Sequence, residues 1–269
     1  MSLRDDLKKE KKKLSRLSFV EKLQYIFDYY KFWILGAVVL VGLVWSVGST
    51  ILHNKPTGFY AMLLNAGGTD LSGQADEAAG KAFAEAAGLD DTKYKILVDT
   101  SATFNPNDQS QFSMAQNAKI AALYQSHDID VMVADPGVFT YYALNGSFVD
   151  LRDALDEETL AGYEASGQVY YIDQHVQDLL NQTDYGELDE MSAFAANLMG
   201  LATVQPREDF VMPDPEKMQT PIPVGIVLAD APWFEENALY QKTTPIFGFA
   251  VKSERQDEAK SFLEFVQAK

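Results

Sequence analysis

The stretch IDVMVADPGVFTYYALNG, residues 129–146, decides the fold of this chain. Its first six residues, Ile129 to Ala134, are apolar apart from one aspartate and predict a buried strand. Asp135-Pro136-Gly137 predicts the end of that strand, because the residue before a proline is biased towards extended backbone. Val138 to Leu144 then predict a short helix that stops at Asn145-Gly146.

The same order of strand and helix occurs twice before this stretch. Phe59 to Asn65 and Tyr94 to Thr100 predict strands, and Gln74 to Ala87 and Ser110 to Tyr124 predict helices. Three such repeats in succession are typical of βαβ units. We therefore expect an α/β fold whose sheet is at least partly parallel and has right-handed crossovers.

The chain returns to this pattern at its end. Pro223 to Leu228 and Thr244 to Val251 predict two more strands, and Glu254 to Gln267 predicts an amphipathic helix. The middle, Asp150 to Met218, is more helical and more acidic, and it is the least readable part. We expect a two-lobed domain in which the chain comes back late to its first lobe, so that strand 246–251 shares a sheet with strand 59–65.

A second informative stretch is FWILGAVVLVGLVWSVGSTIL, residues 32–52, which contains no Asp, Glu, Lys or Arg over 21 residues. At about 1.5 Å per residue, a helix of this length crosses a hydrocarbon core of about 30 Å. Nine lysines and arginines precede it, and only Lys55 follows closely. The positive-inside rule then predicts four parts: a cytoplasmic basic segment at 1–31, a transmembrane helix at 32–52, a linker at 53–58 and an extracytoplasmic domain at 59–269.

Two other interpretations of residues 32–52 are weaker. A cleaved secretory signal has a shorter apolar core and a small-residue cleavage site, which Ser49 to His53 match poorly. A buried core helix that is apolar all round needs a larger protein than the 217 residues after the span supply. We expect an uncleaved single-pass anchor in the cell membrane.

The charge of the chain divides at this span. The segment before it holds nine bases and five acids, about +4, whereas the residues after it hold 13 bases and 34 acids, about −21. So acidic a domain argues against nucleic acid as a partner, because phosphate binding needs a basic face. The basic N-terminal segment is typical of contact with anionic membrane lipid. The chain has no cysteine, which excludes disulfides and thiolate chemistry.

Residues 128–155, DIDVMVADPGVFTYYALNGSFVDLRDAL, resemble the extracytoplasmic solute-binding proteins of ABC transporters, which have a type 2 periplasmic-binding fold. In that family a strand that begins with Asp leads to a short helix with an aromatic pair and then to a Gly-x-hydrophobic-x-Asp-Leu turn. Residues 244–267, TPIFGFAVKSERQDEAKSFLEFVQ, are similar to its late strand and following helix. Residues 21–36, EKLQYIFDYYKFWILG, are similar to the start of small membrane-anchored proteins of Gram-positive bacteria. The resemblance implies a two-lobed periplasmic-binding-like domain, although the family's usual anchoring cysteine is missing.

The sequence contains no recognisable catalytic or metal motif. His53, His127 and His175 lie outside the His-x-x-x-His, His-Glu-x-x-His and Gly-x-Ser-x-Gly patterns. For His127, which precedes Asp128, a polar turn between helix and strand is favoured over a metal site. The acidic residues at 184–190 lack the spacing and the glycine of an EF-hand, which favours a solvated loop. We expect no enzyme activity, no cofactor and no metal.

Polar and aromatic residues that follow the predicted strands are the candidates for a ligand site. In open α/β sheets, ligands bind beyond the carboxyl ends of the strands, where helix N-termini supply donors. We expect such a site to include Asn65, Thr69, Thr100, Ser101, Asp135, Tyr141, Asp230 and Trp233. Four of these, Asn65, Ser101, Asp135 and Trp233, are expected to converge, with the Asp135 carboxylate at the rim of the sheet. The competing interpretation of each residue is core packing or a turn.

These features predict a membrane-anchored module that binds or senses a small molecule without catalysis, with an ABC transporter or the subunits of another membrane complex as candidate partners. The alternative is an accessory structural subunit of a membrane complex, with a vestigial cleft. An extracytoplasmic hydrolase is a distant third. A solvent-open cleft lined by polar groups would favour the first function, and a filled cleft beside an exposed apolar patch would favour the second.

Overall fold

The computed structural model describes residues 32–33, 35–45, 55–67, 74–105, 108–182 and 205–268. The chain divides into two units, Met1–Lys55 and Pro56–Lys269. In the first unit, residues 35–45 are helical and every side chain among them is exposed. None of the helices in the described residues combines the length and the apolar character that a membrane crossing requires. Residues 34 and 46–52 of the predicted span lie outside the described residues.

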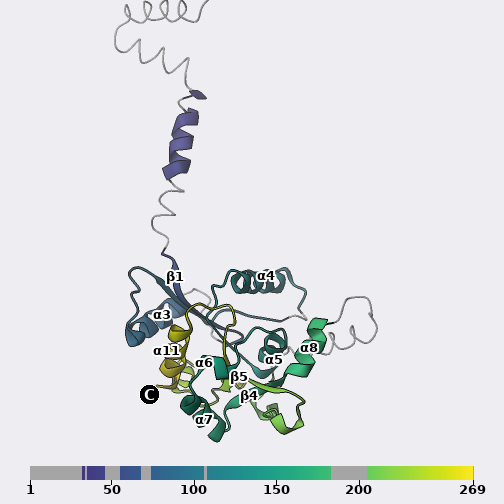
Figure 1. The fold of residues 1–269 in the computed structure, drawn as a ribbon. Coiled ribbons are helices and arrows are strands. Elements are labelled where there is room, and N and C mark those ends of the chain that lie inside the picture. Colours follow the sequence, from purple (N-terminus) through teal and green to yellow (C-terminus); the bar gives the residue numbers. More distant parts are fainter. Residues whose placement is uncertain are drawn as a thin grey trace, which may run out of the picture. The chain divides into compact units, whose positions relative to one another are not determined.

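The second unit is built on one sheet of six described strands, in the order β2-β1-β3-β6-β5-β4 (Figure 1). The strands are β1 (Thr57–Leu63), β2 (Lys95–Asp99), β3 (Val131–Ala134), β4 (Val169–Asp173), β5 (Pro221–Val227) and β6 (Ile246–Phe249). β1 pairs in parallel with its two neighbours, β2 and β3. The other three pairs, β3 with β6, β6 with β5 and β5 with β4, are antiparallel. The prediction of an α/β fold with a partly parallel sheet is confirmed.

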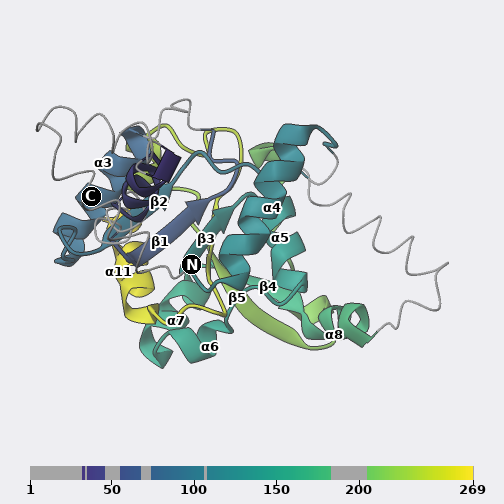
Figure 2. The ribbon, with the colours of Figure 1, turned by 90° about the horizontal axis from the view of Figure 1, so that it is seen from above.

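The longer helices cover both faces of this sheet (Figures 1 and 2). They are α3 (Gln74–Ala87), α4 (Gln111–Gln125), α5 (Pro136–Leu144), α7 (Glu157–Ala165), α8 (Gln174–Gln182) and α11 (Gln256–Gln267). Shorter turns are α6 (Leu151–Ala154), α10 (Pro232–Glu236), η1 (Arg207–Asp209) and η2 (Pro215–Lys217). Strands and helices therefore alternate strictly up to α5, and the order of elements is less regular after it.

Alternation along the strands produces two cores, because successive side chains of a strand point to opposite faces of a sheet. Phe59, Ala61 and Leu63 of β1 belong to one core, which also holds Phe83 of α3 and Phe262 of α11. The second core takes the intervening residues of β1 and is covered by α4 and α5; its largest members include Met62, Leu64, Ile120, Met132 and Phe139. Burial on both faces explains why the strands of this chain read as continuous apolar runs.

The structure corrects the sequence predictions at several places. β1 begins and ends two residues before the predicted strand, and Asn65 lies in a turn with φ of 54°. α5 begins at Pro136, because Asp135 caps it. β4, which pairs with β5, was not predicted at all. β1 and β6 share the sheet through β3, as expected for a chain that returns late. A division into two lobes stays a prediction, since the described strands form one sheet.

Candidate functional site

The Asn65 side chain at the end of β1 is fully engaged with the loop that follows β2. Its Nδ2 donates to the Phe104 carbonyl at 3.0 Å, and its Oδ1 accepts from the Phe104 backbone N–H at 3.0 Å. The Asn65 backbone N–H donates to the Ala102 carbonyl at 3.0 Å. The left-handed backbone of Asn65 is tolerable for asparagine and turns the chain into this contact. The amide thus clamps two loops together.

Asp135, at the end of β3, has no exposed surface. Its Oδ1 accepts from the backbone N–H groups of Gly137 at 3.2 Å and Val138 at 3.4 Å, as an N-cap of α5 does. Gln205 N–H donates to the same oxygen at 3.4 Å, and Asn65 Nδ2 reaches Oδ2 at 3.5 Å. Burial raises the pKa of Asp135, although these bonds offset part of the rise. The carboxylate therefore lies beneath the rim where we expected it to be exposed, because α5 starts directly on top of it.

Tyr240 was not predicted as part of this region, yet it lies across the ends of β1 and β3. It is buried, and its hydroxyl lies 2.9 Å from the Val133 carbonyl and 3.1 Å from the Leu64 carbonyl. Its backbone N–H donates to the Ala66 carbonyl at 2.9 Å. Burial keeps the pKa of Tyr240 well above its ordinary value, so the hydroxyl stays a donor. No local pattern around Tyr240 predicts these contacts, which join segments far apart in the chain.

Thr100 and Ser101, at the end of β2, are also engaged with neighbouring carboxylates. Thr100 donates from its N–H and its hydroxyl to Asp76 Oδ1, at 2.8 and 2.6 Å. Ser101 donates in the same way to Asp99 Oδ1, at 3.0 and 2.8 Å. Neither hydroxyl proton remains for a ligand.

The buried Asp99 carboxylate is the centre of a small polar cluster. Its Oδ2 accepts from the Tyr60 hydroxyl at 2.8 Å and from Lys119 Nζ at 3.2 Å. Burial alone would raise the pKa of Asp99, but the hydrogen bonds from Ser101 and Tyr60 and the charge of Lys119 bring it below its ordinary value. Burial and the nearby carboxylate raise the pKa of Tyr60. This cluster ties β1, β2 and α4 together.

The two aromatic residues predicted to border the ligand site, Tyr141 and Trp233, pack against protein side chains, and so does Tyr142 beside them. Tyr141 and Tyr142 of α5 each pack on Phe104, with ring centroids 5.2 and 5.1 Å apart. Trp233 of α10 packs on Phe262 and Phe265 of α11, in the core on the other face of the sheet. The predicted convergence of Asn65, Ser101, Asp135 and Trp233 is thus not formed, although Asn65 and Asp135 do meet. Thr69 lies outside the described residues.

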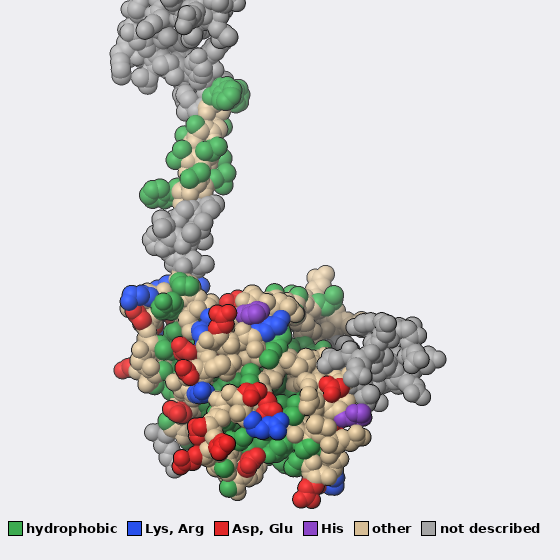
Figure 3. Space-filling model, in the orientation of Figure 1, with side chains coloured by type: hydrophobic (Ala, Val, Ile, Leu, Met, Phe, Trp, Pro, Cys, Tyr) green, Lys and Arg blue, Asp and Glu red, His purple; other side chains and the backbone are tan. Residues whose placement is uncertain are grey.

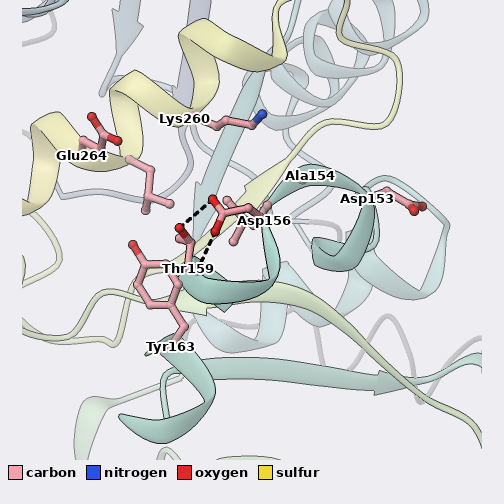
Figure 4. A pocket seen from close by; sticks show the side chains of 9 residues that line it. Asp153, Ala154, Asp156, Thr159, Tyr163, Lys260 and Glu264 are labelled. Atoms are coloured by element: carbon pink, nitrogen blue, oxygen red, sulfur yellow. Dashed lines mark hydrogen bonds between the residues drawn. The ribbon is translucent and has the colours of Figure 1, made fainter. Parts of the chain in front are cut away.

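Asp230 lies apart from the other candidates, in the turn after β5. It is exposed and borders a shallow hollow of about 240 Å³, together with Gln168, Pro232 and Gln267. A larger hollow of about 340 Å³ opens between α6, α7 and α11. Lys260 and Glu264 border it from α11, and Asp156, Thr159 and Tyr163 lie on the opposite side (Figure 4).

The polar groups of this larger hollow are partly engaged as well. Asp156 caps α7 and accepts from the Thr159 N–H at 2.9 Å and from its hydroxyl at 2.8 Å. The Tyr163 hydroxyl donates to Gln267 at 2.8 Å, and Lys260 Nζ lies 3.4 Å from Asp257. One ammonium beside several carboxylates suits a small zwitterion better than an anion.

Nothing in the described parts of the chain gathers three His, Asp or Glu side chains around a common point where a metal ion would fit. His127 lies in the turn after α4 with φ of 61°, as predicted for a polar turn. The acidic residues at 184–190 and His53 lie outside the described residues. The carboxylates described above therefore cap helices or accept hydrogen bonds from neighbouring residues of the domain.

Comparisons with known proteins leave the resemblance to solute-binding proteins a prediction. No family model matches the sequence, and neither a search of curated proteins nor one of solved structures gave a match.

Proposed function

We propose that this chain is a single-pass membrane protein whose C-terminal α/β domain serves, outside the cytoplasm, as a non-catalytic accessory subunit of a membrane complex such as a transporter. One observation carries the proposal. The polar side chains at the carboxyl ends of β1, β2 and β3, where a ligand of such a sheet would bind, are bonded to the domain itself.

A small molecule would have to displace these internal bonds to bind there. Each buried donor or acceptor left without a partner costs about 1–3 kcal/mol, so a ligand must replace every bond that it breaks. Tyr240 and Phe104 also occupy the space beside Asn65 and Asp135. A filled strand-end region of this kind fits a periplasmic-binding-like domain that no longer captures a solute.

The membrane anchor in this proposal is the segment 32–52. Its support is the run of 21 uncharged residues and the nine bases before it. The described helical residues 35–45 expose Val38, Leu40 and Trp45, which are large apolar side chains that lipid would cover.

A second candidate, the binding of a small solute, is favoured by the hollow between α7 and α11. Its volume of about 340 Å³ is within the range of ligand pockets. Lys260 beside Asp156 and Glu264 would suit an amino acid or a similar zwitterion (Figure 4).

A thermal-shift screen of the full chain in mild detergent separates the two candidates. A ligand present at about one hundred times its dissociation constant adds about 2.7 kcal/mol of stability. We expect no such shift with sugars, amino acids, oxyanions or short peptides. A shift with an amino acid that disappears in Lys260→Ala, but not in the control Lys242→Ala, would establish the second candidate instead.

Two further measurements test the accessory role directly. After gentle extraction from its native membranes, the chain should migrate in native electrophoresis in a complex larger than its own 29.9 kDa. Migration as a lone subunit would contradict the accessory role. Protease added to intact protoplasts should remove the domain after His53 and spare an N-terminal tag, and loss of that tag would overturn the proposed orientation.

A further inference from the structure

Helix α4 presents an apolar surface to solvent. Only Ser113 and Ile120 are buried along its length. Phe112 and Met114 each expose 62% of their surface. The other exposed residues of α4 are alanines, glutamines and one lysine. We call all the exposed residues together the α4 outer face: Gln111, Phe112, Met114, Ala115, Ala118, Lys119, Ala121, Ala122 and Gln125.

The α4 outer face contains no acid. Residues 111–125 include no Asp or Glu and a single base, although the residues after the predicted span carry 34 acids. The base, Lys119, is held at 3.2 Å by the buried Asp99. Because it carries no acid, this helix face adds no charge repulsion towards an anionic surface, although the residues after the span carry about −21.

This face lies on the side of the domain at which the chain arrives. Arg255 donates to the Thr57 carbonyl at 3.3 Å and to the Asp128 carbonyl at 3.1 Å, so the first strand starts beside the end of α4. Figure 2, which looks down on Figure 1 from above, has α4 in front of the strands, and Figure 1 shows β1 beginning on that same side.

Bases and an aromatic side chain surround the start of β1. The Lys95 N–H donates to the Pro56 carbonyl at 2.9 Å, and Tyr94, beside Gly58, is 45% exposed. With Lys93, Lys119, Lys252 and Arg255, at least five of the 13 bases after the span lie on this side. Their charge is offset by five acids on the same side: Asp90, Asp91, Asp99, Asp128 and Asp130. Figure 3 shows most of the visible Asp and Glu side chains below this edge of the domain.

We propose that the α4 outer face, together with Tyr94 and Lys95, rests on the outer leaflet of the bilayer. The inference depends on the membrane anchor of the proposed function. From Leu52 to Thr57 the chain can extend about 17 Å at most, at roughly 3.5 Å per residue. The surface around Pro56 is therefore held close to the headgroups. Along α4, which ends beside that surface, Phe112 and Met114 of the first turn are the exposed side chains that gain most from contact with acyl chains.

A second copy of the chain fits this face less well. Two domains of about −21 repel each other, whereas a lipid surface meets one domain on a side whose helix α4 carries no acid. Headgroup contact also suits Tyr94 and Lys95, because aromatic and lysine side chains favour the membrane interface.

The absence of cysteine from the chain makes the test specific. We would introduce Ala115→Cys on the α4 outer face, and Ala161→Cys on α7 as the matched control, since both alanines are exposed and helical and α7 lies at the far side of the domain in Figure 1. Each full chain is labelled with a polarity-sensitive dye and reconstituted into phosphatidylcholine vesicles that contain phosphatidylglycerol. The dye at residue 115 should show blue-shifted emission that spin-labelled lipid quenches, and the dye at residue 161 should emit as in water.

The outcomes separate this inference from the proposed anchor. A chain that does not float with the vesicles has no anchor, and both proposals then fail. A chain that floats but emits as in water from both positions keeps the anchor and overturns the lipid contact. Blue-shifted emission at residue 115 that spin-labelled lipid does not quench would assign the face to a second copy of the chain and overturn the lipid contact. The lipid contact further requires that Phe112→Ser with Met114→Ser abolish the quenching while flotation persists.

Discussion

The carboxyl ends of the strands and the α4 outer face differ in what their side chains contact. At the strand ends, Asn65, Asp135 and Tyr240 are polar, and each is hydrogen-bonded within the domain. On α4, Phe112 and Met114 are apolar, and each is largely exposed. Polar residues at the first region thus stabilise the fold, whereas the apolar residues of the second contribute little to it.

The difference has a physical reason. A buried polar group that loses its partner costs about 1–3 kcal/mol, so bonded polar side chains hold the strand ends tightly. A Phe or Met side chain contributes about 1.5–3 kcal/mol when it is fully buried, and α4 forgoes most of that contribution at two positions. We conclude that the stability of the fold explains the polar side chains at the strand ends. It does not explain why the α4 outer face carries large apolar side chains.

Asp135→Ala should produce the largest loss of stability at the strand ends. The substitution removes the α5 cap, worth about 1 kcal/mol, and takes the shared acceptor away from Asn65 Nδ2 and the Gln205 N–H, of which Nδ2 keeps its bond to Phe104. We expect the free energy of unfolding to fall by about 2–4 kcal/mol in urea denaturation of the full chain. The exposed Asp230→Ala should stay within about 0.5 kcal/mol. Equal, small effects of the two variants would mean that Asp135 is not structural.

Asp99→Asn should cost about 1.5–3 kcal/mol at neutral pH, since it removes a charged acceptor from Tyr60 and Lys119. The pKa of Asp99 is lowered in the fold, so its contribution is present above the unfolded value of about 3.9 and is lost as pH falls through the folded pKa. The gap in unfolding free energy between wild type and variant should therefore narrow in acid. A gap that widens in acid would contradict the assignment.

For Asp135, the gap in unfolding free energy between wild type and variant should change with pH in the opposite direction. The two buried carboxylates can then be compared directly. Its pKa is raised by burial, so protonation stabilises the fold at low pH, and that stability is lost as pH rises through the folded pKa. The gap between wild type and Asp135→Asn should therefore narrow as pH rises from acid towards neutrality. If the unfolding free energies of Asp99→Asn and Asp135→Asn changed with pH in the same way relative to wild type, one of the two assigned pKa directions would be wrong.

Tyr240→Phe should cost about 1 kcal/mol, the net contribution of one hydrogen bond. The loss is moderate because the Val133 carbonyl keeps the Leu64 N–H at 2.8 Å when the hydroxyl is removed. Tyr94→Phe, at an exposed position, is the control and should stay within about 0.5 kcal/mol. Thermal unfolding of both variants measures the difference, and indistinguishable melting temperatures would exclude Tyr240 as a structural hydrogen-bond donor.

The sequence was sufficient for the order of elements in the first half of the domain. Short apolar runs bounded by turn residues, such as the one that ends at Asp135-Pro136-Gly137, predicted β1 to β3 and the helices between them. The edge strand β4 was missed because its five residues lie in the acidic middle with no turn signal that separates it from α8.

The contacts of the strand ends could not be predicted in the same way. Asn65 meets Phe104 across 39 residues and Asp135 across 70, and Tyr240 meets Leu64 across 176. Spacing along the chain carries no signal for such pairs. The sequence therefore located the polar residues at the strand ends but not the partners that occupy them, and those partners decide between a binding site and a structural one.

Phe112→Ser combined with Met114→Ser should have the smallest effect on folding. Both side chains are already exposed, and Ser and Phe have similar helix propensity, so each change should alter the free energy of unfolding by no more than about 0.5 kcal/mol. Ile120→Ala on the buried side of the same helix is the matched control and should cost about 2–4 kcal/mol. If the double variant is instead destabilised as strongly as Ile120→Ala, the α4 outer face packs within the domain. The side chains of both regions would then be packed inside the domain, so the contrast between them would fail. Helix α4 would also have no exposed apolar surface with which to contact the bilayer.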